Sequence, residues 1–151
     1  MDVRAGDFGD PQVVELLREH LAGMHASSPP GSVYALDLSG LQQSAVTFFT
    51  VWDGEDLLAC GALKHLDDET CELKSMRTSA RHLRRGAGAF LLEHLLGVAR
   101  TRGYRRVCLE TGTGAAFEPA IALYRKYGFA PCACFGDYEA TEFNQFMQLA
   151  L

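Results

Sequence analysis

Residues 77–96, RTSARHLRRGAGAFLLEHLL, join basic side chains and two closely spaced glycines to a run with helical periodicity. The N-terminus of a helix offers unpaired backbone N–H groups and about half a positive charge, and a bound phosphate satisfies both. Gly86 and Gly88 lack the Cβ atoms that would keep a phosphate away from these amides. Arg84 and Arg85 add positive charge around the turn. The pattern favours the binding of a phosphate group.

Other interpretations of this turn remain open at the level of residue types. A glycine-rich loop that only reverses the chain, with its arginines in solvent, accounts for the same residues nearly as well. A dinucleotide-binding fingerprint fits worse, because G-x-G-x-x-G is incomplete and the preceding strand belongs to a meander. A Walker A loop fits worse still, since no Gly-Lys-Ser/Thr follows.

The pattern around the turn predicts a strand before it and a helix after it. CELKSMRT, residues 71–78, is the third strand of a meander whose first strands, AVTFFTVW and DLLACGALKHL, flank the hairpin turn Asp53-Gly54. The following helix carries its apolar side chains on one side, and RRVCLET is then a buried strand. Strand, turn, helix and strand form a βαβ crossover, so the sheet contains one parallel step.

Further elements complete a mixed α+β fold with a mostly antiparallel sheet. Asp10 and Pro11 begin the first helix, and a short helix runs from Glu118 and Pro119 to Gly128. The remaining segments are a strand at residues 1–5, a long loop at residues 25–40 with a helical turn near Leu38, and strands near residues 130–133 and 143–149.

Composition limits the class of protein and its partners. A chain of 151 residues with 48% hydrophobic residues predicts a single domain over residues 1–151. A formal charge of −5 argues against nucleic acid and anionic membranes as partners. The scattered cysteines lack zinc-site spacing, and the chain shows neither a signal-peptide pattern nor a membrane-spanning run. We therefore expect a cytoplasmic protein with no metal.

The run ELKSMRTSARHLRRGAGAFLLEHL, followed later by AIALYRKYGF, resembles the GCN5-related N-acetyltransferase (GNAT) family. Members of this family transfer an acetyl group from acetyl-CoA to an amine, and the resemblance covers residues 72–129. It implies a GNAT-like sheet with helices on both faces, and direct transfer to a primary amine in a ternary complex. The alternatives are a non-catalytic acyl-CoA-binding module of the same fold and a nucleotide-binding or phosphate-sensing domain.

The resemblance also implies which residues hold acetyl-CoA. The family's phosphate loop reads Q/R-x-x-G-x-G/A, and Leu83 departs from its first position. Because the loop holds pyrophosphate mainly through backbone amides, we expect this departure to weaken binding without abolishing it. Backbone groups at the end of the preceding strand bind the pantetheine arm in the family, and Phe117 replaces a common asparagine. The implied contacts are Met76, Arg77, Thr78, Leu83, Arg84, Arg85, Gly86, Ala87, Gly88, Ala89, Phe117 and Tyr124.

Acetyl transfer needs a neutral amine, stabilisation of the oxyanion and a proton for the thiolate. Tyr124 matches the family tyrosine near the coenzyme A sulfur, which implies a general acid, although a tyrosine packed on its helix is the ordinary alternative. Glu72 matches the glutamate base of histone-acetylating members. Strand alternation places Glu72 on the same face as Lys74 and Met76. Pairing of Glu72 with a lysine is the ordinary alternative, and Glu110 or a water chain are the other candidate bases.

The acceptor is left open as a small-molecule amine or a peptide, and a homodimer is possible. Acidic residues flank the segments expected to form the acceptor side, and they favour a cationic amine. They are Asp37, Asp137, Glu139 and Glu142.

Overall fold

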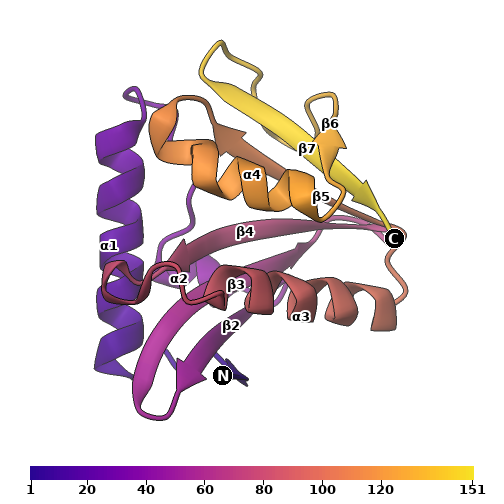
Figure 1. Ribbon diagram of the computed structural model, residues 1–151. Coiled ribbons are helices and arrows are strands. Elements are labelled where there is room, and N and C mark those ends of the chain that lie inside the picture. Colours follow the sequence, from indigo (N-terminus) through magenta and orange to yellow (C-terminus); the bar gives the residue numbers. More distant parts are fainter.

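The computed structural model describes residues 1–151 and contains a seven-stranded sheet of order β1-β2-β3-β4-β5-β7-β6 (Figure 1). Only β4 and β5 pair in parallel, which confirms the predicted α+β class with one parallel step. The strands are β1 (Asp2–Ala5), β2 (Val46–Asp53), β3 (Asp56–His65), β4 (Thr70–Thr78), β5 (Arg106–Gly112), β6 (Ala130–Pro131) and β7 (Asn144–Ala150).

The first helix begins where Asp10 and Pro11 predict, whereas the short helix near Pro119 includes Glu118 as its first residue and has no side-chain cap. Asp10 Oδ1 accepts a hydrogen bond of 2.8 Å from the N–H of Gln12, and proline occupies the first turn of both α1 and α4. None of the helices is long and apolar enough to cross a lipid bilayer. The four are α1 (Pro11–Ser27), α2 (Leu38–Leu41), α3 (Ala87–Thr101) and α4 (Glu118–Lys126), with 3₁₀ turns η1 (Ala80–His82) and η2 (Ala115–Phe117).

Helices cover both faces of the sheet, as the GNAT resemblance implies. Leu91 of α3 and Ile121 of α4 belong to one core cluster, together with Val51 of β2. The neighbouring strand residue Trp52 faces the other way and packs with Leu17 of α1 in a second cluster. In Figure 1, α3 and α4 lie across the same face of the sheet. Helices α3 and α4 therefore cover one face of the sheet, and α1 covers the other.

The parallel strands β4 and β5 separate soon after they pair. Their ladder joins Thr70–Glu72 to Arg106–Cys108 and ends there, and the two ribbons then diverge (Figure 1). The edge of β4 beyond Glu72 that faces β5 therefore has no strand partner. Backbone hydrogen-bonding groups left free in this way are available to a ligand.

A bulge in β4 changes which way its last side chains point. Lys74 pairs with Ala62 but Arg77 pairs with Cys60, so β4 holds one extra residue, and Ser75 has φ 56°. The bulge sends the Arg77 side chain to the α1 face, where it contacts His20. Met76 instead packs with the α3 cluster.

The expected alternation of Glu72, Lys74 and Met76 on one face of β4 is therefore wrong for Met76. The extra residue at the bulge reverses the direction of every side chain that follows it.

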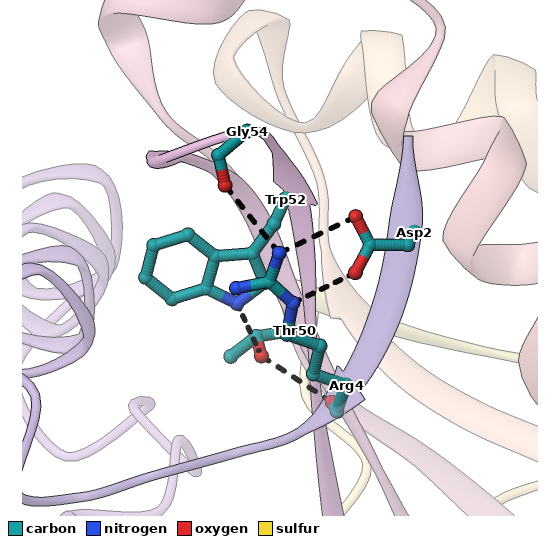
Figure 2. A network of polar contacts seen from close by, with 5 residues as sticks. All are labelled: Asp2, Arg4, Thr50, Trp52 and Gly54. Carbon is teal, nitrogen blue, oxygen red and sulfur yellow. Dashed lines mark hydrogen bonds and ion pairs between the residues drawn. The ribbon is translucent and has the colours of Figure 1, made fainter.

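At the opposite edge of the sheet, a polar network joins β1 to β2 and its hairpin turn. Figure 2 shows Arg4 between Asp2, 2.7 Å away, and the carbonyl oxygen of Gly54, 3.4 Å away. The Arg4 guanidinium lies 5.0 Å above the Trp52 ring, and Trp52 Nε1 donates to Thr50 at 2.9 Å. These contacts hold β1 in register far from the β4–β5 gap, which is a structural role.

Candidate active site

A pocket of about 420 Å³ lies where β4 and β5 separate, a volume typical of small-molecule sites. Residues from both faces of the sheet line it. Those on the α3 and α4 side include Met76, Thr78, Leu83, Gly88, Phe117 and Tyr124. Those on the α1 side include His20, Gly23, Tyr34, Glu72, Lys74, Arg77 and Glu110. The pocket therefore lies in the gap in the sheet and is bordered by residues from both of its faces.

The predicted phosphate turn opens α3, a helix of 15 residues. Arg84 and Gly86 adopt left-handed φ angles of 63° and 81°, which curl the backbone tightly before the helix begins. No backbone N–H between Leu83 and Ala89 donates to a backbone acceptor of the protein. Free N–H groups at the N-terminus of a long helix are the donors that a phosphate requires.

The two glycines of the turn serve different needs. A Cβ at Gly86 would meet no protein atom within 4 Å, but its φ of 81° is strained for any other residue. A Cβ at Gly88 would lie 3.5 Å from Thr78 Oγ1, an ordinary contact. The protein itself therefore has room for a small side chain at position 88, and the space that Gly88 leaves open faces the pocket.

Arg85 braces the turn against the β2–β3 hairpin. Its guanidinium lies 2.6 Å from an Asp53 carboxylate oxygen and 3.0 Å from Nδ1 of His82. The side chains of Arg85 and Asp53 are each about half exposed to solvent, so this ion pair contributes little to stability. The positive charge expected around the turn is thus reduced, because the charge of Arg85 is already matched by a carboxylate.

Tyr124 of α4 reaches the pocket with its hydroxyl free. The side chain is 6% exposed, its ring packs 5.7 Å from that of Phe129, and its hydroxyl makes no hydrogen bond within the protein. Burial raises the pKa of Tyr124 to about 12, so the hydroxyl stays protonated at neutral pH. Tyr127, by contrast, donates to Glu93 over 2.6 Å. Tyr124 therefore has a hydroxyl proton available in the pocket, whereas the hydroxyl of Tyr127 is bound to Glu93.

Glu72 is deeply buried and already engaged. The side chain is 2% exposed, Lys74 Nζ lies 3.3 Å from its Oε2, and the Tyr138 hydroxyl donates to the same oxygen. Lys74 also donates to the Tyr138 oxygen over 2.6 Å. Burial and the nearby Glu72 charge raise the pKa of Tyr138, which keeps it a donor. The pairing of Glu72 with a lysine, which was the ordinary alternative to a role as general base, is present.

Tyr138 contacts the pocket residues Glu72 and Lys74, and the sequence did not indicate it. It lies in the segment CFGDYEATEF, which has no helical or strand periodicity. Its ring packs edge-on against Tyr34 at 4.9 Å, and Tyr34 lines the pocket, so the long loop before α2 forms part of the pocket wall on the α1 side. Only tertiary packing brings these two loops together, and no local signal encodes it.

Glu110 of β5 lines the same pocket but, unlike Glu72, is not paired with a lysine. It forms no ion pair, and its side chain is half-buried. Burial raises the pKa of Glu110, and a hydrogen bond with Asn144 and the charge of Lys74 oppose that rise only in part. Its carboxylate is therefore a stronger base than an ordinary glutamate.

The acidic residues expected near the acceptor lie elsewhere. Asp37 caps α2, where its Oδ1 accepts from the N–H of Gly40 at 2.8 Å. Asp137, Glu139 and Glu142 are exposed and do not line the pocket. The expectation that these four acids favour a cationic acceptor thus finds no support in their positions.

Comparisons with known proteins agree with this geometry. The family model "Acetyltransferase (GNAT) family" matches residues 12–129. "Uncharacterized N-acetyltransferase YsnE" of Bacillus subtilis strain 168 is 46% identical over 97% of each chain. "Uncharacterized N-acetyltransferase YedL" of Escherichia coli K12 is 46% identical over 99% of this chain and 94% of the relative.

Solved structures share the fold over nearly the full length. A Klebsiella pneumoniae protein assigned to the acyl-CoA N-acyltransferases superposes with a TM-score of 0.83 at 24% identity, covering 99% of this chain and 97% of that one. A GNAT family acetyltransferase from Elizabethkingia anophelis with acetyl-CoA bound gives 0.71 at 16% identity, with the same coverage. The family match and the two relatives at 46% identity establish that this chain belongs to the GNAT family as an acetyl-CoA-dependent N-acetyltransferase.

Proposed function

We propose that the chain acts as a single domain that transfers the acetyl group of acetyl-CoA directly to a neutral primary amine, with both substrates bound together. The observation that carries this proposal is the pocket at the β4–β5 gap, whose lining comes from both faces of the sheet. The donor enters from the α3 and α4 side and the amine from the α1 side. No covalent acetyl-enzyme is needed when the two substrates can meet.

The donor is held mainly by backbone groups. The free N–H groups from Leu83 to Ala89 bind its phosphates, and the unpartnered edge of β4 from Met76 to Thr78 binds the pantetheine arm. Phe117, which is 8% exposed, offers an apolar surface to that arm. The acetyl-CoA-bound structure from Elizabethkingia anophelis supports this assignment through its shared fold.

Glu110 takes the proton of the amine, directly or through water. A general base needs a free lone pair and a pKa near the working pH, and Glu110 has no ion pair and a raised pKa. Glu72 matches the family's glutamate in sequence, but its Oε2 already accepts from Lys74 and Tyr138. The role of Glu72 is then to hold those two side chains in place.

Tyr124 gives its proton to the departing thiolate. Its free, protonated hydroxyl and its place in the pocket lining support this role. A tyrosine that served packing alone would need no access to the pocket.

Initial-rate kinetics test direct transfer. With acetyl-CoA and an accepted amine both varied, a ternary complex gives intersecting double-reciprocal lines, whereas parallel lines indicate an acetyl-enzyme. A non-catalytic acyl-CoA-binding module would bind acetyl-CoA and release no CoA with any amine. Displacement of bound acetyl-CoA by ATP at equal concentration would favour a nucleotide-binding domain instead.

A further inference from the structure

The side chain of Arg77 points toward α1, away from the face that α3 and α4 cover. The backbone of Arg77 belongs to the donor edge of β4, but the bulge at Ser75 turns its side chain to the α1 face. There Nε donates to Nδ1 of His20 at 3.0 Å, and Nη2 donates to the carbonyl oxygen of His20 at 3.3 Å. Gly23 makes room for the guanidinium, because a Cβ there would lie 2.9 Å from Nη2.

The positive charge of Arg77 is not matched by any carboxylate. The acidic side chains that form ion pairs are paired with other bases: Asp2 with Arg4, Glu15 with Arg18, Asp53 with Arg85, Glu69 with Arg105 and Glu72 with Lys74. The groups that contact Arg77 are uncharged. Burial and the Arg77 charge lower the pKa of His20 to about 4, and burial raises that of Cys60 to about 12.

The fixed guanidinium still has donors to offer. An arginine carries five N–H donors, and the two bonds to His20 use only two of them. A planar fork held in one orientation by a neighbouring helix matches a carboxylate, which accepts two parallel hydrogen bonds from it. In a half-buried pocket, an unmatched positive charge is stabilised most by a ligand with negative charge.

Glu110 adds a negative charge to the lining of the same pocket, and this charge favours a cationic group. This carboxylate also lacks an ion-pair partner, and it lies on β5 across the gap from the end of β4. Arg77 and Glu110 are thus two unmatched charges of opposite sign in the lining of one cavity of about 420 Å³. A small molecule with an acidic group and an amine complements both.

We propose that the acceptor is a small amino carboxylic acid, whose carboxylate binds the guanidinium of Arg77 while its amine lies toward Glu110. This proposal rests on the proposed transfer to a primary amine and specifies its substrate class.

The test compares each amino acid with the amine that lacks its carboxylate. The pairs are L-phenylalanine and phenethylamine, L-histidine and histamine, L-methionine and 3-(methylthio)propylamine, and L-serine and ethanolamine, extended to the other standard amino acids. Release of CoA gives kcat/KM for each member. For the accepted pairs, we expect the acid to exceed its amine by roughly 10- to 100-fold, the range of a hydrogen-bonded charge pair.

Substitutions of Arg77 assign this preference to its side chain. Arg77→Met should lower the acid-to-amine ratio to near 1, and Arg77→Lys should retain part of the ratio, because the charge stays while the fork is lost. Arg18→Met is the matched control, since Arg18 is an exposed α1 residue paired with Glu15 at 2.7 Å, outside the pocket. The control should keep the wild-type ratio, and melting temperatures verify that each variant is folded.

The outcomes separate this proposal from the proposed function. Faster acetylation of the amines than of the acids overturns the carboxylate site and leaves transfer to amines standing. Equal loss of activity on acid and amine in Arg77→Met also overturns it, because a residue that only ties β4 to α1 would act on both. If neither set releases CoA while acetyl-CoA binds, both the amino-acid acceptor and transfer to small primary amines are contradicted.

Discussion

Arg77 of β4 donates from Nε to Nδ1 of His20 in α1 across 3.0 Å, and this bond requires the imidazole to be neutral at that nitrogen. His20 is 5% exposed, so a second proton on its ring would create a positive charge that is both buried and adjacent to a guanidinium. The contact therefore makes the junction of α1 and β4 sensitive to acid.

Acid should destabilise the fold through His20. Its pKa falls from 6.5 in the unfolded chain to about 4 in the fold, so the unfolded state binds more protons between these values. The stability that depends on neutral His20 is present above pH 6.5 and is lost as pH falls toward 4, by up to about 3 kcal/mol. Urea denaturation at pH 7 and pH 5 measures this loss in the free energy of unfolding.

His20→Asn is the variant that isolates this effect. Asparagine offers Oδ1 where histidine offers Nδ1 and does not titrate, so the acid-induced loss between pH 6.5 and 4 should shrink. An unchanged pH dependence in the variant would assign the acid sensitivity to other groups.

The phosphate turn predicts a specific response to substitution at Gly88. Acetyl-CoA at about one hundred times its Kd should stabilise the wild type by ~2.7 kcal/mol, and Gly88→Val should remove most of that gain by filling the space before the free amides. Thermal shift with and without acetyl-CoA measures both.

Gly97→Val is the matched control for the turn. Gly97 lies in α3, and a Cβ there meets no atom within 4 Å. This variant should keep the acetyl-CoA shift. Equal shifts in the two variants would place the phosphates elsewhere on the molecule.

Glu110 and Glu72 should differ when each is changed to glutamine. Glu110→Gln removes the proposed base and should lower kcat by ~10²-fold or more with acetyl-CoA affinity retained. Glu72→Gln breaks a buried pair with Lys74 and should lower the free energy of unfolding by about 3 kcal/mol or more.

Kinetics and denaturation of both variants check this division. If Glu110→Gln keeps kcat within a few-fold of the wild type while Glu72→Gln is stable but inactive, Glu72 and not Glu110 is the general base.

Tyr124→Phe should reduce turnover by about 10- to 100-fold without unfolding the protein, because a thiolate needs only modest protonic assistance. The hydroxyl makes no hydrogen bond in the protein, and phenylalanine keeps the ring that packs near Phe129. Turnover across pH, with the melting temperature as control, measures the effect. Wild-type activity at every pH would leave Tyr124 a packing residue.

Local sequence signals predicted the fold well. Capping by Asp10 and Pro11, the Asp53-Gly54 hairpin and the βαβ order correspond to α1, β2–β3 and the parallel β4–β5 step. These features depend on neighbours in the chain, so their residue types carry the information.

The acceptor side was much less predictable. The bulge at Ser75 has no glycine in β4 to mark it, only Gly61 on the partner strand, and it decides where Arg77 points. Tyr138 reaches Glu72 from a loop without periodicity, and His20 looked like one more residue of an amphipathic helix. These contacts join segments far apart in the chain, and their formation depends on packing across the sheet.

A crystal structure with coenzyme A bound tests the central claim most directly. The account predicts the pyrophosphate within hydrogen-bonding distance of the N–H groups between Leu83 and Ala89, and the sulfur in the β4–β5 gap within reach of the Tyr124 hydroxyl. Coenzyme A bound outside this gap, or with its sulfur pointing away from Tyr124 and toward solvent, would contradict the account.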